Sequence, residues 1–186
     1  MNKLIRLLFL IIVLLLIVGG FFYWENQKDV MKLNKNLPEG VRVVKTLNGK
    51  YKVVNKIDGY EFKVRDEWGG IEEIEYIPER TEKGYTAASI EFEGRKGGSR
   101  IISIDRFKTE LLDFNLGIWA RTFFDTFELV GNFKEDKVGE FEILKTKEEV
   151  HLMGMYVYFF KKNSIIYAVT CGSEEFIQDI IINGKW

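Results

Sequence analysis

The sequence predicts an α+β fold: a single domain with an antiparallel β-sheet flanked by helices, preceded by one N-terminal transmembrane helix. The first observation is an apolar run, from Leu7 to Trp24, that contains no charged side chain. The second is a series of short segments with a period of two, joined by turn dipeptides such as Asn48-Gly49 that are typical of antiparallel strands. The third is a pair of helical patterns, after residues 112 and 173, that stand apart from the strands.

Residues 1–24 have the features of a membrane anchor or of a cleaved secretory signal. Eighteen helical residues from Leu7 to Trp24 span about 27 Å, close to the hydrocarbon thickness of a bilayer. The apolar core of a signal peptide usually has about 7–15 residues, and this run is longer. It also ends with Tyr23 and Trp24, where an interfacial aromatic belt would lie. We therefore expect an uncleaved anchor, and a cleaved signal is the alternative.

The charges before the apolar run predict the side of the membrane on which the rest of the chain lies. Lys3 and Arg6 precede the run, and positive charge keeps that end of a membrane segment in the cytoplasm. Both interpretations therefore put the rest of the chain outside the cytoplasm, on a single-pass protein of the cell membrane if the anchor is kept. Residues 25–40 are polar and lysine-rich and predict a linker. Residues 41–186 then predict one extracytoplasmic domain of common size.

Several of the expected strands alternate apolar and polar side chains, and others, such as residues 165–171, are apolar runs. In the clearest of the alternating strands, Tyr60, Phe62 and Val64 point to one face and the charged residues between them to the other. Pro78 ends the fourth strand in this interpretation. The expected strands are residues 41–44, 51–54, 60–64, 71–77, 85–93 and 100–107, followed after a helix by 139–146, 155–160 and 165–171.

The first helix of the domain is expected to lay an aromatic face on the sheet. Its apolar residues recur at spacings of three and four between Leu112 and Phe127, and Asp113 is the expected N-cap. The simplest interpretation of its aromatic side chains is that they belong to the core. If part of the group is exposed, it becomes a partner-binding patch. The residues of this candidate patch are Trp119, Phe123, Phe124 and Phe127.

A short C-terminal helix is expected to close the domain. Ser173 is its predicted N-cap and Gly184 its predicted end. A stripe of four apolar side chains at helical spacing is expected to face the sheet. These side chains are Phe176, Ile177, Ile180 and Ile181.

Charge and residue chemistry favour binding over catalysis. Without the anchor, the chain carries 25 basic and 28 acidic residues, and this balance argues against a nucleic-acid partner. Cys171 ends an apolar run and is expected to be a buried hydrophobic side chain, and His151 has no second His or Cys for a zinc site. Carboxylates such as Glu73 and Glu91 alternate with apolar residues, which predicts a solvated sheet face. We therefore predict no catalytic residue, metal ligand or cofactor.

Two stretches of the chain carry a resemblance to a known family. They are IDGYEFKVRDEW, residues 57–68, and the hairpin YFFKKNSIIYAVTC, residues 158–171, which is followed by the isoleucine-rich helix and the final Trp186. In these features the chain resembles the PsbP-like domain family over about Tyr51 to Trp186. The family includes photosystem-associated lumenal subunits, a Ran-binding nuclear-transport cofactor and bacterial extracytoplasmic proteins. The resemblance implies an antiparallel sheet flanked by helices and no shared catalytic residues.

Three functional hypotheses remain open at this point. The leading one is a membrane-anchored extracytoplasmic binding or accessory protein, an assembly or stabilising factor of a cell-envelope complex with a protein partner. The second is an extracytoplasmic hydrolase whose carboxylate- or metal-based site is dispersed in the sequence. The third is a purely structural tether.

Overall fold

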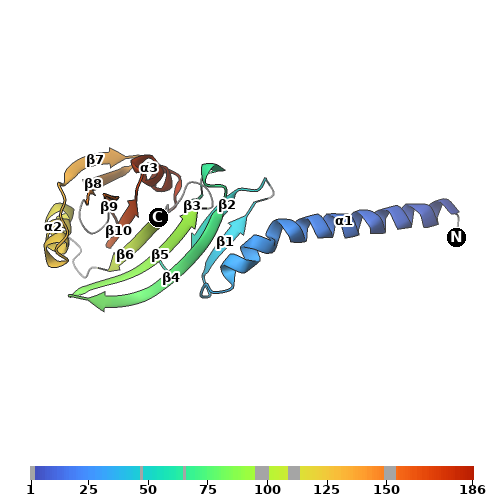
Figure 1. The fold of residues 1–186 in the computed structure, drawn as a ribbon, viewed down its shortest axis with the longest axis horizontal. Helices are drawn as coiled ribbons and strands as arrows, with labels where there is room; N and C mark the ends of the chain where they lie inside the picture. Colours follow the sequence, from blue (N-terminus) through green and yellow to red (C-terminus); the bar gives the residue numbers. More distant parts are fainter. Residues whose placement is uncertain (1–2, 47, 65, 95–100, 109–113, 149–153) are drawn as a thin grey trace.

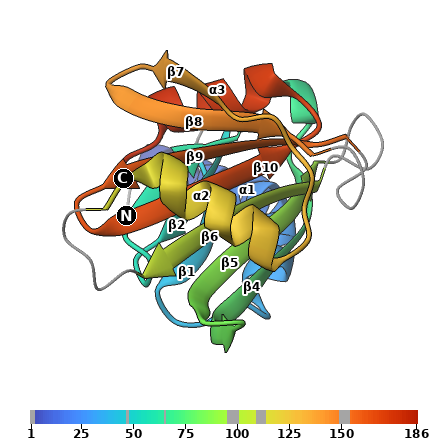
Figure 2. The same ribbon diagram turned by 90° about the vertical axis from the view of Figure 1, so that its left-hand side faces the viewer.

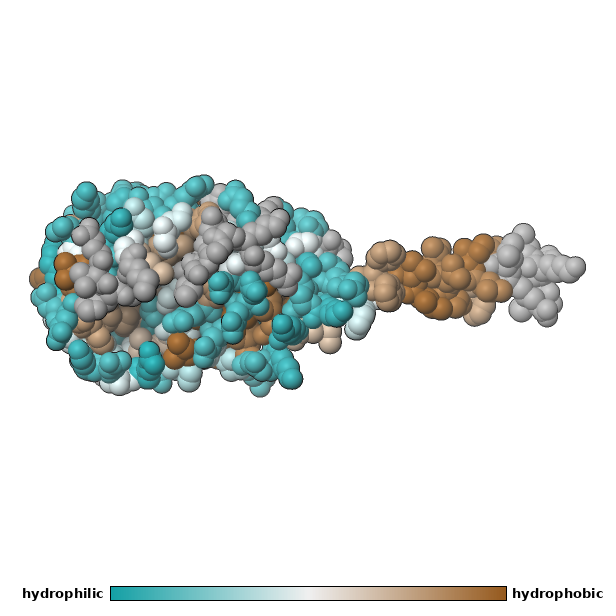
Figure 3. Space-filling model, in the orientation of Figure 1, coloured by the Kyte–Doolittle hydropathy of each residue, from teal (hydrophilic) through white to brown (hydrophobic). Residues whose placement is uncertain are grey.

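A computed structural model of the chain describes residues 3–46, 48–64, 66–94, 101–108, 114–148 and 154–186. Helix α1 (Lys3–Asn34) projects from a folded domain that contains the other elements (Figure 1). Its apolar residues between Leu8 and Trp24 are exposed along the projecting part, which forms a brown rod beside a mostly teal domain (Figure 3). Within the described residues, this one helix is long and apolar enough to cross a membrane.

The start of the segment expected to be a linker is the last part of α1. Residues 25–34 remain helical because they pack on the domain instead of lying free in solvent. Val30 and Leu33 are buried in the main core. The Asn34 side chain donates a hydrogen bond to the Val43 carbonyl at 2.9 Å and accepts one from the Val43 amide at 2.7 Å. A single helix therefore joins the apolar run directly to the domain.

The strands form two antiparallel sheets, which confirms the α+β class and divides the expected sheet in two. The small sheet has the order β1-β2-β3 and contains β1 (Val41–Lys45), β2 (Tyr51–Asn55) and β3 (Tyr60–Lys63). The large sheet has the order β4-β5-β6-β10-β9-β8-β7. Its strands are β4 (Ile71–Glu82), β5 (Tyr85–Gly94), β6 (Ile101–Lys108), β7 (Lys134–Val138), β8 (Phe141–Lys147), β9 (Tyr156–Lys162) and β10 (Ile165–Cys171).

The two faces of the large sheet are covered by different elements. The small sheet and α3 (Glu174–Asn183) cover one face, where they form the larger core with side chains such as Ile104 and Val169. Helix α2 (Leu116–Thr126) lies across the other face, over a second core that contains Phe107 and Ala168 (Figure 2). A one-turn helix η1 (Asp66–Trp68) connects the two sheets. Alternate residues of one strand thus serve two separate cores.

Two edge strands differ from the sequence-based expectation. Strand β4 continues to Glu82, past Pro78, where the sequence predicts its end. Proline is tolerated there because β4 is an edge strand whose register with β5 shifts between Ile77 and Arg80. Strand β7 was not predicted, because four of its five residues are exposed and charged and only Val138 is buried.

The terminal helix has the predicted buried stripe. Its four apolar side chains from Phe176 to Ile181 are buried, and Gly184 is its C-cap. Ser173 occupies the N-cap position with an extended backbone, but its side chain makes no capping hydrogen bond in the described structure. Burial of the apolar stripe, rather than the cap, therefore holds α3 on the sheet.

Candidate functional site

Helix α2 has its N-cap two residues after the position that the sequence predicts. Its N-cap is Asn115, whose side chain accepts a hydrogen bond from the Ile118 amide at 3.0 Å. The predicted cap, Asp113, lies outside the described residues. Ala120 and Phe124 are buried beneath the helix, and Ile118 is exposed on its outer side. The helix is therefore amphipathic and turns one aromatic face to the sheet.

The four aromatic residues of the candidate patch, Trp119, Phe123, Phe124 and Phe127, lie on that inner face. Phe124 is buried and the other three are half-buried. The Trp119 ring lies 5.0 Å from the Phe107 ring of β6, and the Phe123 ring lies 4.7 Å from the Phe127 ring. The group therefore lines the space between α2 and the sheet instead of forming an exposed patch.

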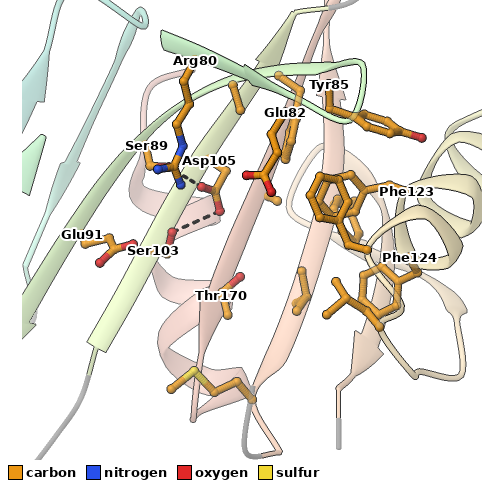
Figure 4. Close-up of a pocket in the computed structure, with 18 residues that line it drawn as sticks. Arg80, Glu82, Tyr85, Ser89, Glu91, Ser103, Asp105, Phe123, Phe124 and Thr170 are labelled. Atoms are coloured by element: carbon orange, nitrogen blue, oxygen red, sulfur yellow. Dashed lines mark hydrogen bonds between the residues drawn. The ribbon is translucent and has the colours of Figure 1, made fainter. Parts of the chain in front are cut away.

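A pocket of about 390 Å³ lies between α2 and the large sheet. Its volume is within the range of small-molecule sites, roughly 300–1,000 Å³. Strands β4, β5, β6, β9 and β10 and the inner face of α2 supply the lining. Aromatic and aliphatic side chains form one wall (Figure 4). The main apolar residues of this wall are Phe107, Phe123, Phe124, Phe127, Val157 and Phe159.

The opposite wall of the pocket is polar and centres on Asp105. The Ser89 hydroxyl donates a hydrogen bond to one carboxyl oxygen of Asp105 at 2.5 Å, and the Ser103 hydroxyl donates to the other at 3.0 Å (Figure 4). Ser89 lies directly opposite Asp105 in the β5–β6 pairing, and Ser103 lies two residues earlier on the same face of β6. The hairpin register therefore assembles this group.

Burial raises the pKa of the Asp105 carboxyl above its usual range, and the negative charge of Glu91 adds to the rise. The two serine hydrogen bonds and the positive charge of Arg80 act in the opposite direction, but burial is the largest effect. A carboxyl kept partly out of water pays a desolvation cost when it ionises. A cationic or hydrogen-bonding group that enters the pocket would therefore stabilise the Asp105 carboxyl.

The charged side chains of the pocket have an excess of carboxylates. Glu82, Glu91 and Asp105 line it together with one guanidinium, that of Arg80. Figure 4 shows Glu82 and Arg80 directed toward Asp105 from β4. The polar wall is net negative even when Asp105 is protonated. An apolar wall that faces a negative wall suits a ligand with an apolar body and a cationic head group.

The polar residues of this pocket were not found from the sequence, although Phe123, Phe124 and Phe127 of the candidate patch line it. Glu91 was assigned to a solvated sheet face, but it is half-buried and lines the pocket. Ser103 and Asp105 alternate with the core residues Ile102 and Ile104. This alternation indicates a polar group on the second face of β6. Combined with the antiparallel pairing of β5 and β6, it could have revealed the polar wall of the pocket.

Other sequence predictions have simpler outcomes. Cys171 is buried in the larger core, as expected. Glu72, Glu73 and Glu75 are exposed on β4, which agrees with a solvated face. His151 lies outside the described residues. Within the described part of the chain, no group of three or more His, Cys, Asp or Glu side chains is arranged to hold a metal ion.

Comparison of the chain with protein-family models, with curated proteins and with solved structures finds no match.

Proposed function

We propose that this protein is a membrane-anchored, extracytoplasmic binding protein, and that the pocket beneath α2 holds a small ligand with an apolar body and a cationic head. The observation that carries this proposal is the aromatic wall that faces the buried carboxyl of Asp105. Stacking and burial against Phe123 and Phe127 would bind the apolar body. Asp105, with Glu82 and Glu91 nearby, would pair with the head group.

In this proposal the protein acts as an accessory or stabilising factor of a cell-envelope complex, and a protein partner recognises it in its ligand-bound form. The compact domain on a membrane helix, with a built pocket but without a metal cluster among its described residues, supports an accessory role. The PsbP-like resemblance over Tyr51 to Trp186 agrees with it and stays a prediction.

The proposed location is the outer side of the cell membrane, with the N-terminus in the cytoplasm. The exposed apolar run of α1 supports the membrane location. Lys3 and Arg6 support the orientation, against Lys28 and Lys32 on the other flank, which favour the reverse one. Protease added to intact spheroplasts is expected to digest the domain and to leave the membrane segment attached. Full protection of the domain until the cells are lysed would show that the domain lies in the cytoplasm. A mature chain that begins near Phe21 would replace the anchor by a cleaved signal.

Binding of a cationic ligand is tested with three probes that share one ring system. Naphthylethylamine, naphthylethanol and naphthylacetate carry a cationic, a neutral and an anionic head on the same apolar body. We expect the amine to bind the full-length chain at least tenfold more tightly than the alcohol, because a hydrogen bond to a charged group contributes about 1.5–3 kcal/mol, and the acetate to bind most weakly. Titration of probe fluorescence measures the three affinities. Equal affinities would refute the cationic head.

The variant Asp105→Asn separates binding from folding. It is expected to remove the preference for the amine while it stabilises the fold at neutral pH. A carboxyl whose pKa is raised by folding stabilises the folded state while it is protonated. This contribution is complete below the unfolded pKa of about 3.9 and is lost as the pH rises through the folded pKa. The stability gain of the variant should therefore grow as pH rises from acid to neutral. Asp125→Asn, on the exposed side of α2, is the matched control and should change neither property.

A hydrolase is the second candidate function, and one observation favours it. Asp105 has a raised pKa and lies in a pocket close enough to Glu91 for the two charges to interact, and a carboxyl with a raised pKa is typical of a general acid. Turnover of an ester or amide bearing an amine, abolished in Asp105→Asn while the fold is kept, would favour this function. Tight binding without turnover would favour the binding protein.

A further inference from the structure

The end of α1 is attached to the small sheet by polar contacts as well as by burial. The Asp29 carboxylate lies 3.4 Å from the Lys45 ammonium and accepts a hydrogen bond from the Tyr51 hydroxyl. The Gln27 side-chain amide donates to the Lys45 carbonyl at 3.4 Å. Together with the paired hydrogen bonds of Asn34, these contacts hold about two turns of α1 against β1 and β2. The helix and the small sheet therefore form one rigid unit.

The β1–β2 turn is the part of the sheet that lies nearest the apolar run. Helix α1 runs into the domain, and β1 runs back beside it, so that Val43 lies beside Asn34 while Lys45 lies beside Gln27. Figure 1 shows the connection between β1 and β2 at the end of the domain from which α1 emerges. If α1 crosses a bilayer, the turn is the first part of the domain to meet the lipid headgroups.

Charge is distributed unevenly between the two parts of the chain outside the apolar run. Residues 25–64, the end of α1 and the small sheet, contain nine Lys or Arg and five Asp or Glu, a net charge of +4. Residues 65–186 contain 16 basic and 23 acidic residues, a net charge of −7. The part beside the membrane helix is thus positive, although the whole chain is slightly acidic. The net charge of this part stays positive when the part is extended to Trp68.

Several lysines of the positive part are exposed at the end nearest the apolar run. Lys28 is on α1, Lys50 ends the β1–β2 turn, and Lys63 ends β3, where it pairs with Lys52 at the same end of the sheet. The acidic residues on this part of α1 are paired with lysines, Glu25 with Lys28 and Asp29 with Lys45. Lys28, Lys50 and Lys63 therefore form a positive surface around the base of the apolar run, with Glu25 and Glu67 as exposed carboxylates beside it.

We propose that this positive surface rests on anionic lipid headgroups of the bilayer that α1 spans, with Lys28, Lys50 and Lys63 as the contacting residues. The inference depends on the proposed membrane anchor but not on the pocket ligand. Contact at the turn, added to the rigid attachment of α1, would hold the domain in one orientation. In that orientation α2 lies at the opposite end of the domain, away from the membrane (Figure 1). The pocket that α2 helps to line lies there with it. The ligand would then enter from the aqueous side.

The test measures how close the turn is to the headgroups. The full-length chain with Asn48→Cys carries a bimane fluorophore, and selective labelling is favoured because Cys171 is buried. The chain is reconstituted in nanodiscs of phosphatidylcholine alone or mixed with phosphatidylglycerol, each with a headgroup-nitroxide lipid as quencher. We expect stronger quenching in the anionic nanodiscs, lost at high salt, because a lysine near an anionic surface shifts the population by about fivefold. Equal quenching in both nanodiscs would overturn the proposal.

Matched variants assign the effect to the three lysines. Lys28→Glu, Lys50→Glu and Lys63→Glu together should abolish the difference between the nanodiscs. The same charge change at three exposed lysines of residues 65–186 should leave the difference between the nanodiscs intact. If these control variants abolish the difference as well, net charge causes it, and its assignment to Lys28, Lys50 and Lys63 is refuted. These control positions are Lys134, Lys137 and Lys147. A fluorophore at Asp125→Cys on α2 should be unquenched throughout. Failure of the chain to enter nanodiscs would instead refute the anchor, and the probe titrations would be unaffected.

Discussion

Replacement of Arg106 by leucine is expected to lower the free energy of unfolding by about 3–5 kcal/mol. The Arg106 side chain is 11% exposed, and its Nε atom lies 3.3 Å from Oδ1 of Asp58, whose side chain is 1% exposed. Removal of the guanidinium leaves this carboxylate buried without its counter-charge. Urea unfolding of the full chain in detergent micelles, followed through the fluorescence of buried Trp68, measures the change.

The position of Asp58 explains why the effect should be large. The side-chain amide of Asn55 donates to its carboxylate at 2.7 Å, and the Tyr167 hydroxyl donates to its carbonyl at 3.1 Å. Asp58 is in the turn between β2 and β3, whereas Arg106 and Tyr167 are in β6 and β10 of the large sheet. The pair therefore joins the two sheets, and its loss weakens the contact between them as well as one ion pair.

A double-mutant cycle distinguishes this reason from simple loss of a side chain. Asp58→Asn combined with Arg106→Leu removes both charges, and the double variant should be more stable than Arg106→Leu alone. If the effects of the two single variants simply add, the buried pair contributes no coupling and the explanation is wrong. Lys108 is exposed on the same strand as Arg106, and both side chains contact Glu79 of β4. Lys108→Leu is therefore the control for loss of the Glu79 contact and should change stability by less than about 1 kcal/mol.

The variant Ile180→Ala is expected to lower the free energy of unfolding by about 2–5 kcal/mol, the range for buried isoleucine truncations. Ile180 is 2% exposed within the larger core. The same helix also places the Phe176 ring 5.2 Å from the Trp68 ring of η1, so α3 covers the segment that connects the two sheets. The urea titration described for Arg106 applies without change.

Helix α3 supplies its own control for this truncation. Ile182 is two residues further along and 58% exposed, so Ile182→Ala deletes the same atoms with the same small gain in helix propensity. We expect a change within about 0.5 kcal/mol. Similar losses for both variants would mean that burial of Ile180 is not the cause of its effect. A loss near zero for both would make α3 peripheral and its stripe a candidate docking surface.

Local patterns in the sequence were sufficient for most of the elements. The long apolar run predicted the helix that is exposed in the fold, alternation predicted strands such as β5, and a short apolar run predicted β10. The apolar stripe of the last helix was likewise visible from the spacing of Phe176, Ile177 and Ile180. These features depend on which side chains avoid water within one segment, and period alone reveals that. Strand β7 was not predicted because a charged edge strand shows little hydrophobic periodicity.

The functional features depend on contacts between segments, which only the tertiary structure decided. Asp105 reads as an ordinary acidic residue in its strand, and it becomes the centre of a pocket only when the β5–β6 register brings Ser89 opposite and α2 covers that face. Residues 25–34 read as a polar linker because their contacts with β1 involve only a few positions. Arg106 and Asp58 are far apart in sequence and meet only when the two sheets pack. Sequence by itself therefore determined the elements and the apolar helix, because hydrophobic periodicity is local. The pocket, the fixed attachment of α1 and the buried ion pair were decided by tertiary structure, because register and packing set which polar groups share a buried space.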